Sequence, residues 1–172
     1  MIKIRNKLLV ITLALVIPAL LITGCTRNSQ PQSATVGQPA PDFTLHDLNG
    51  EAVSLSDFAG RPVFINFWRI NCNPCREEIP FLQAVAEETQ GELVMLGINV
   101  GDDTSSIEQF LENNSFSLSI LLDSDITVAR QYGIPGTPTT FFIDEEGIIK
   151  AKVIGPFPSK GAIDSRLSEI MP

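Results

Sequence analysis

The sequence predicts an α/β domain built on a mixed sheet. Segments rich in β-branched and aromatic residues alternate with segments of helical periodicity, the order that builds parallel strands. The last two strand-like segments form a hairpin, which adds an antiparallel pair. The chain has 172 residues, of which 44% are hydrophobic and 19% charged. This composition supports one packed core and excludes a solvated, disordered chain.

The first predicted elements are a hairpin and a central strand. Two short β-forming stretches, residues 43–45 and 52–55, flank Asn49-Gly50, a dipeptide that favours a turn with positive φ. The mostly apolar run at residues 63–68, VFINFW, is typical of a strand that is buried on both faces.

A helix, a second buried strand and a second helix are expected next. Residues 76–90 are rich in helix formers, and Pro80 is expected to interrupt and kink that helix. Residues 92–100 repeat the buried-strand pattern. The helix at residues 104–114 is expected to begin with a capping box at Ser105–Glu108.

The last part of the chain adds further strands and helices. Gly133 is expected to cap a short helix whose apolar face includes Ile126, Ala129 and Tyr132. The remaining expected elements are strands at 118–122, 139–143 and 148–154, a turn at 144–147, and a helix from about Ser159.

The N-terminal segment resembles a bacterial lipoprotein signal. Three basic residues precede an uncharged apolar run at 8–22, which is shorter than the ~20 residues that a spanning helix needs. The run ends at Ile22-Thr23-Gly24-Cys25, which is similar to a lipobox, and this implies cleavage after Gly24 and a lipid on Cys25. An ordinary cleaved signal and an uncleaved anchor helix are the alternatives. All three place the domain outside the cytoplasm.

These observations divide the chain into three segments. They are the signal at 1–24, the lipidated Cys25 with a flexible polar tether at 25–38, and a folded domain at 39–172. Loss of the signal removes three of 12 basic residues and no acidic one, so nine positive charges face 20 negative ones and the net charge moves from −8 to −11. This charge argues against a nucleic-acid partner and excludes a polybasic membrane patch. Attachment to the membrane then depends on the lipid.

The cysteine pair is the candidate centre of chemistry. Cys72-Asn73-Pro74-Cys75 lies where a buried strand gives way to a helix, and a helix N-terminus stabilises a thiolate on the first cysteine. Pro74 has no N–H to lose in the first turn. We expect Cys72 to be the exposed nucleophile and Cys75 the shielded resolving thiol. The pair would act as a redox-active disulfide with no other cofactor.

Two other uses of the cysteines are weaker. A structural bridge over two residues closes too short a loop to stabilise the fold much. Zinc normally needs four ligands, and only the two thiols and His46 are available, so no metal site is expected.

Four stretches resemble the thioredoxin superfamily, in its extracytoplasmic TlpA/ResA/CcmG-like branch. They are residues 41–45 (PDFTL), 64–68 (FINFW), 72–80 (CNPCREEIP) and 132–141 (YGIPGTPTTF). The resemblance implies a thioredoxin-like fold, a mixed sheet flanked by helices, with an N-terminal β-hairpin and a central insertion at about 104–122. Residues 69–71 depart from the family, which often carries small residues and a Trp before the first cysteine.

The resemblance also implies roles for single residues. Pro138 matches the cis-proline that lies opposite the cysteines, with Pro135 as the weaker alternative. The backbone of Thr137 would pair with a substrate peptide, and Trp68 would support the wall of that substrate site. Glu78 matches an acid that exchanges a proton with the resolving thiol. The alternative interpretation is that Glu78 is a solvated residue on the surface of the helix.

The function implied is a membrane-tethered thiol–disulfide oxidoreductase that reduces disulfides of extracytoplasmic proteins. The resemblance points to an apocytochrome c before haem attachment as client, and to a membrane thiol transporter of the CcdA or DsbD type as electron donor. The protein would act as a monomer, on the periplasmic side or the outer face of the cell membrane.

Three alternatives stay open. The chain is a general extracytoplasmic disulfide oxidant, isomerase or sporulation-type reductase, or it is a non-catalytic copper- or haem-handling protein that uses the thiols as ligands. A peroxiredoxin is the weakest, because the segment before Cys72 lacks the Pro-x-x-x-Thr-x-x-Cys arrangement.

Overall fold

The computed structural model describes residues 34–114 and 118–171. The strands are β1 Thr44–Asp47, β2 Ala52–Ser54, β3 Val63–Trp68, β4 Val94–Val100, β5 Ser119–Asp123, β6 Thr139–Ile143 and β7 Ile149–Ile154. The helices are the 3₁₀ turn η2 Leu55–Phe58 and the α-helices α2 Asn73–Thr89, α3 Thr104–Asn113, α4 Thr127–Gln131 and α5 Lys160–Leu167. The order of these elements agrees with the α/β prediction.

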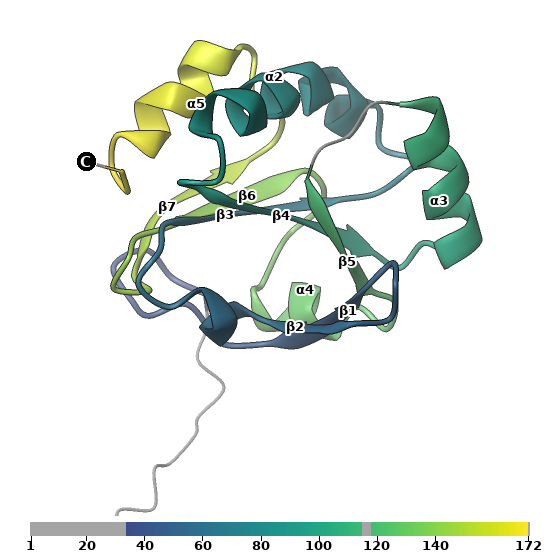
Figure 1. Ribbon diagram of the computed structural model, residues 1–172, viewed down its shortest axis with the longest axis horizontal. Helices are drawn as coiled ribbons and strands as arrows, with labels where there is room; N and C mark the ends of the chain where they lie inside the picture. Colours follow the sequence, from purple (N-terminus) through teal and green to yellow (C-terminus); the bar gives the residue numbers. More distant parts are fainter. Residues whose placement is uncertain (1–33, 115–117, 172) are drawn as a thin grey trace, which may run out of the picture. The chain divides into compact units, whose positions relative to one another are not determined.

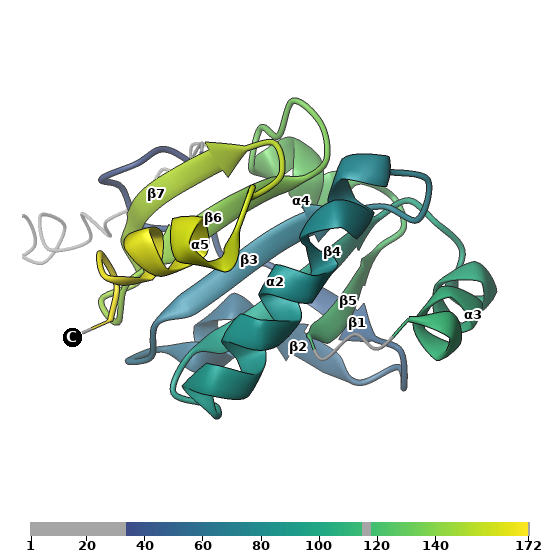
Figure 2. The same cartoon turned by 90° about the horizontal axis from the view of Figure 1, so that it is seen from above.

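The strands form one mixed sheet in the order β2-β1-β5-β4-β3-β6-β7. The central strands β3, β4 and β5 are parallel, whereas β6 and β7 on one side and β1 and β2 on the other pair antiparallel. Helices α2 and α5 lie side by side over one face, and α4 covers the opposite face (Figures 1 and 2). This is the thioredoxin-like fold that the resemblance implies, with its N-terminal hairpin.

Two apolar layers hold the sheet between the helices. Phe64 and Trp68 of β3 belong to the layer under α2, α3 and α5, whereas Ile65 and Phe67 belong to the layer on the α4 side. All six residues of β3 are buried, as expected for a run of β-formers covered on both faces. The strand that leads to the cysteines is therefore fixed from both sides.

The N-terminal ends of two helices are set by caps of different kinds. Helix α2 starts at Asn73, with Pro74 in its first turn as expected, and it continues through Pro80 without the predicted interruption. Helix α3 is capped by Asp103, whose carboxylate accepts a 3.0 Å hydrogen bond from the N–H of Ser106. The expected capping box at Ser105 was wrong, because an acid two residues earlier takes the N-cap position.

The folded domain begins before residue 39. The N–H of Gly37 donates to the carbonyl of Ile149 over 2.7 Å, the N–H of Ile149 donates to the carbonyl of Gln38 over 3.0 Å, and Ala34 is buried. Residues 34–38 thus pack against β7, although we expected them in the tether. Their polar composition concealed backbone pairing, which depends little on side chains.

The remaining predictions for the N-terminus lie outside the described residues. These are the signal at 1–24, the lipid on Cys25 and the first part of the tether, residues 26–33. Between residues 34 and 171, apart from the gap at 115–117, no helix is both long enough and apolar enough to cross a membrane.

Candidate active site

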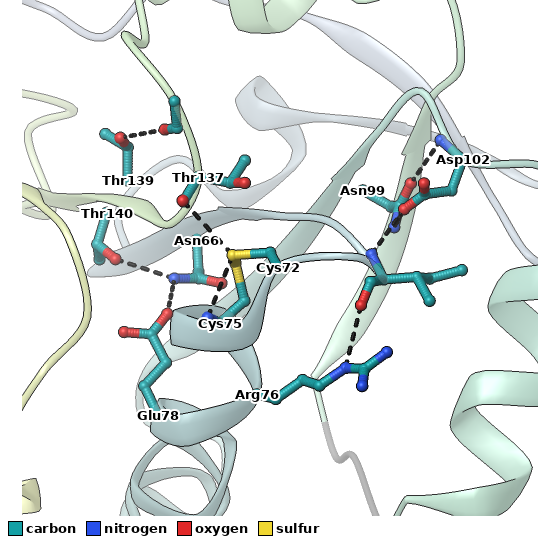
Figure 3. Close-up of a disulfide and its surroundings, with 12 residues drawn as sticks. Asn66, Cys72, Cys75, Arg76, Glu78, Asn99, Asp102, Thr137, Thr139 and Thr140 are labelled. Atoms are coloured by element: carbon teal, nitrogen blue, oxygen red, sulfur yellow. Dashed lines mark hydrogen bonds between the residues drawn. A yellow bond between two sulfur atoms is a disulfide. The ribbon is translucent and has the colours of Figure 1, made fainter.

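The cysteine pair lies just beyond the end of β3, where the chain enters α2 (Figure 3). Cys72 and Cys75 form a disulfide with their Cα atoms 5.2 Å apart. Cys72 is the N-cap of α2, and its Sγ accepts a 3.2 Å hydrogen bond from the N–H of Cys75. Pro74 follows in the first turn, where a missing N–H costs nothing. A negative charge on Cys72 therefore meets a backbone N–H and the positive end of the helix dipole.

The two sulfur-bearing residues differ in access to solvent. Cys72 is 7% exposed and Cys75 is 2% exposed. Both are largely covered, and Cys72 keeps the larger exposed fraction. The order of exposure is the one expected for an attacking and a resolving thiol.

The loop before β6 lies directly against the attacking cysteine. The Thr137–Pro138 peptide bond is cis, as the resemblance implies, and the alternative at Pro135 was wrong. The carbonyl oxygen of Thr137 is 3.4 Å from Sγ of Cys72. The hydroxyl of Thr139, the first residue of β6, donates a 2.7 Å hydrogen bond to the carbonyl of Gly136. This bond stabilises the loop at the end that enters β6.

Glu78 is a buried acid, with no exposed surface, one helical turn beyond Cys75. Its Oε1 accepts a 2.9 Å hydrogen bond from Nδ2 of Asn66, and its Oε2 accepts one of 3.0 Å from the N–H of Phe157. Burial raises the pKa of the Glu78 carboxyl from 4.5 to about 7, although both hydrogen bonds act in the opposite direction. A solvated helix position is thereby excluded, and the acid can gain or lose a proton near neutral pH.

Asn66 and Thr140 belong to the same buried network, although the sequence analysis did not single them out. Nδ2 of Asn66 donates its second hydrogen to Oγ1 of Thr140 over 3.0 Å. Both residues are at most 1% exposed. The available signal was an asparagine in the middle of an otherwise apolar buried strand, since a buried amide needs partners.

The loop of residues 69–71 is held by Asp102, which follows β4. The sequence did not point to this residue. Oδ2 of Asp102 accepts hydrogen bonds from the N–H of Ile70 over 2.8 Å and from Nδ2 of Asn99 over 3.0 Å. Arg69 pairs with the same carboxylate at 3.7 Å, and Nε of Arg76 donates to the Ile70 carbonyl over 3.1 Å. The segment that leads to Cys72 is thus held by partners on both sides (Figure 3).

Trp68 lies in the buried apolar layer to which both cysteines belong. It is 2% exposed, and its ring centroid is 5.4 Å from that of Phe110 in α3. The guanidinium of Arg76 lies over the Phe110 ring, 5.6 Å from its centroid. A Cβ at Gly97 in β4 would come within 3.3 Å of Trp68 Nε1, so glycine keeps room for the indole. Trp68 therefore lies where it can support the wall from inside, the role that the resemblance implies for it.

Other candidate ligands stand apart from the cysteines. His46 is exposed on β1. Among the residues that the structure describes, no three His, Cys, Asp or Glu side chains gather closely enough to hold a metal ion.

Comparisons with known proteins agree with this geometry. The model of the AhpC/TSA family matches residues 36–152. The chain is 36% identical over 145 residues to the thiol-disulfide oxidoreductase ResA of Geobacillus thermodenitrificans, covering 84% of this chain and 83% of the relative.

Two solved structures are similar over most of the domain. One, described as thiol:disulfide interchange protein DsbE of Chlorobium tepidum, has a TM-score of 0.74 and 29% identity, over 79% of this chain and 97% of the other. The other, the exposed lipoprotein thioredoxin of Streptococcus pneumoniae, has a TM-score of 0.67 and 27% identity, over 76% of this chain and 100% of the other.

Proposed function

The chain belongs to the AhpC/TSA family and is a thiol–disulfide oxidoreductase, and we propose that it works as a reductant of disulfides in extracytoplasmic proteins. The observation that carries the proposal is the buried Glu78, placed one turn beyond Cys75 and able to change its protonation near neutral pH. A resolving thiol must lose its proton before it can attack, and in this proposal the carboxyl of Glu78 takes it.

The reaction begins with the thiolate of Cys72. It attacks one sulfur of the client disulfide, and the other client sulfur leaves as a thiolate and takes a proton from water. The backbone of Thr137, against Cys72 Sγ, pairs with the client segment during this step.

The second step releases the client and regenerates the disulfide. Cys75 gives its proton to Glu78 and attacks Cys72 Sγ, so the Cys72–client bond breaks and the second client sulfur leaves. Two electrons have then moved from the cysteine pair to the client. A membrane thiol transporter of the CcdA or DsbD type returns two electrons and restores the dithiol.

The N-terminus supplies the membrane attachment in this proposal. A signal at residues 1–24 and a lipid on Cys25 tether the domain to the outer face of the cell membrane or its periplasmic side. The lipobox-like sequence supports this, as does the likeness to a structure described as an exposed lipoprotein thioredoxin. Replacing Cys25 by Ser is expected to release the protein from the membrane fraction.

The client that we propose is the oxidised cysteine pair of an apocytochrome c. The test replaces Cys72 by Ser in the native host and measures haem covalently bound to c-type cytochromes. Loss of bound haem that returns when a small thiol reductant is added to the medium is the expected result. Unchanged haem attachment would refute the cytochrome client and leave the thiol–disulfide chemistry untouched.

A further inference from the structure

A hollow of about 290 Å³ opens beside the loop that carries Thr137. Its walls come from the loop after β3, from α4, and from the loop before β6. Ile126, Ile134 and Pro135 give it an apolar floor, and the side chains of Arg69 and Arg130 complete the wall. We call this hollow the arginine groove. Its volume lies near the lower limit of ligand pockets, ~300 Å³, which suits one or two side chains better than a cofactor.

The arginine groove begins where a client must lie. Thr137 lines it, and the carbonyl oxygen of the same residue is 3.4 Å from Cys72 Sγ. A client joined to Cys72 by a mixed disulfide therefore passes over Thr137. Successive residues of an extended chain are ~3.3 Å apart, so a residue that flanks the client cysteine reaches the mouth of the groove.

The charge of this groove is opposite to that of the domain. Four of the 12 basic residues precede residue 34, so eight remain in the domain against 20 acidic ones. No acidic residue lines the arginine groove. The hollow of about 410 Å³ on the other side of residues 69–71 has Asp102 and Asp103 in its lining and no Lys or Arg. The residues that line the two hollows thus carry charges of opposite sign.

Both arginines can turn toward an incoming group. The Arg69 side chain is 48% exposed and meets Asp102 only at 3.7 Å. Arg130 is exposed in the last turn of α4. Its positive charge contributes to the lowered pKa of Asp125, after the hydrogen bonds from Thr127. A guanidinium binds a carboxylate through two parallel hydrogen bonds, which an exposed ion pair at 3.7 Å does not supply.

We propose that the arginine groove selects client disulfides that are flanked by an acidic residue. The carboxylate of a client Glu or Asp binds Arg130 and Arg69, and the methylene groups of that residue contact the apolar floor. The inference rests on the proposed thiol–disulfide exchange at Cys72 and names the substrate class of that site. It also gives a role to Arg69, a position where the chain departs from the family pattern.

The test compares peptides that differ only in charge. Three peptides carry the same intramolecular Cys-x-x-Cys disulfide, flanked on both sides by Glu, by Gln or by Lys. Their second-order rates of reduction by the full-length dithiol protein in detergent are measured at ~0.15 M salt, where exposed charges are screened beyond ~8 Å. We expect the Glu peptide to react about fivefold faster than the Gln peptide, from two exposed ion pairs. The net charge of the domain alone would favour the Lys peptide.

Variants distinguish binding in the arginine groove from the effect of the overall charge of the domain. Arg130→Gln should lower the Glu preference and Arg130→Glu should reverse it, whereas Arg130→Lys should keep most of it. Arg166→Gln, which removes an exposed arginine of α5, is the matched control and should keep the full preference. The inference is overturned by equal rates for the Glu and Gln peptides, or by equal losses in the Arg130→Gln and Arg166→Gln variants.

A small neutral disulfide distinguishes this inference from the function on which it rests. If the protein reduces 2-hydroxyethyl disulfide but does not prefer the Glu peptide, only the arginine groove fails as a selector. If it reduces neither the peptides nor the neutral disulfide, the proposed reductase function fails together with the inference.

Discussion

The side-chain amide of Asn66 in β3 donates a 2.9 Å hydrogen bond to Oε1 of Glu78 in α2. The bond joins the strand that leads to the cysteines to the helix that carries them. The backbone N–H of Phe157 occupies the other carboxyl oxygen, so both oxygens have partners although the group has no exposed surface. Glu78 is thereby fixed one helical turn beyond the resolving cysteine, and burial raises its pKa to about 7.

Burial of Glu78 should make the stability of the oxidised protein depend on pH. The pKa of Glu78 is raised from 4.5 to about 7, so between these values the folded state holds a proton that the unfolded state has lost. The contribution of Glu78 to stability is therefore fully present below about pH 4.5 and is lost as the pH rises toward 7, an effect on the order of 3 kcal/mol. Urea unfolding between pH 4 and pH 8 measures this slope.

Two variants assign that slope to Glu78. In Glu78→Gln the fall in stability with rising pH should largely disappear, whatever the absolute stability. Glu77→Gln changes the exposed neighbour on the same helix and should keep the wild-type slope. A wild-type slope in Glu78→Gln would show that another group titrates.

Asn66→Ala should raise the pKa of Glu78 further. The hydrogen bond from Asn66 stabilises the carboxylate and so lowers the pKa of Glu78. Without this bond, the effect of burial, which raises the pKa, is opposed less. The carboxyl ¹³C resonance of Glu78, followed against pH in the oxidised protein, gives the titration directly. Thr140→Val is the control, because it removes the other partner of Asn66 and leaves the Glu78 bond in place. An unchanged titration in Asn66→Ala would contradict the network as described.

Asp102→Ala should loosen the loop in front of Cys72. Its carboxylate accepts the 2.8 Å hydrogen bond from the N–H of Ile70, and loss of a charged acceptor costs about 1–3 kcal/mol. Hydrogen exchange at the Ile70 amide should become faster. Asp103→Ala, which removes the cap of α3, should weaken that helix and leave exchange at Ile70 unchanged. Equal exchange rates at Ile70 in wild type and Asp102→Ala would show that other contacts hold the loop.

Cys75→Ser should trap the client on the enzyme. Cys72, the more exposed cysteine, can still attack a disulfide, but no thiol remains to release the product. Incubation with an oxidised Cys-x-x-Cys peptide should then give a covalent adduct, detected by mass spectrometry without reductant. Cys72→Ser should give little adduct. The opposite pattern would exchange the roles of the two cysteines.

The sequence predicted most clearly what depends on local pattern. The strand at residues 63–68 has the predicted bounds, because an apolar run between turn residues has few other ways to be buried. Helix α2 begins at the Cys-x-x-Cys motif, as the placement of Pro74 in the first turn predicted, and its cap is the sulfur of Cys72. Asp103 was missed as the cap of α3, because Ser105, three residues before Glu108, fits the capping-box pattern.

The polar contacts around the site were the part that the sequence concealed. Asp102 lies 32 positions after Ile70, and Thr140 lies 74 positions after Asn66. Such pairs form only when β3, β4 and β6 are brought together in the sheet, and helical or strand periodicity carries no signal for them. Glu78 was identified through a family resemblance, and the structure supplies the physical reason in its burial.

The central claim is that the cysteine pair donates electrons, and its reduction potential tests this most directly. The full-length protein in detergent is equilibrated with a series of thiol redox buffers, and the fluorescence of Trp68, the only tryptophan, reports the fraction reduced. The account predicts a value at or below about −230 mV, toward that of thioredoxin. A value near about −120 mV, typical of a strong oxidant, would contradict it.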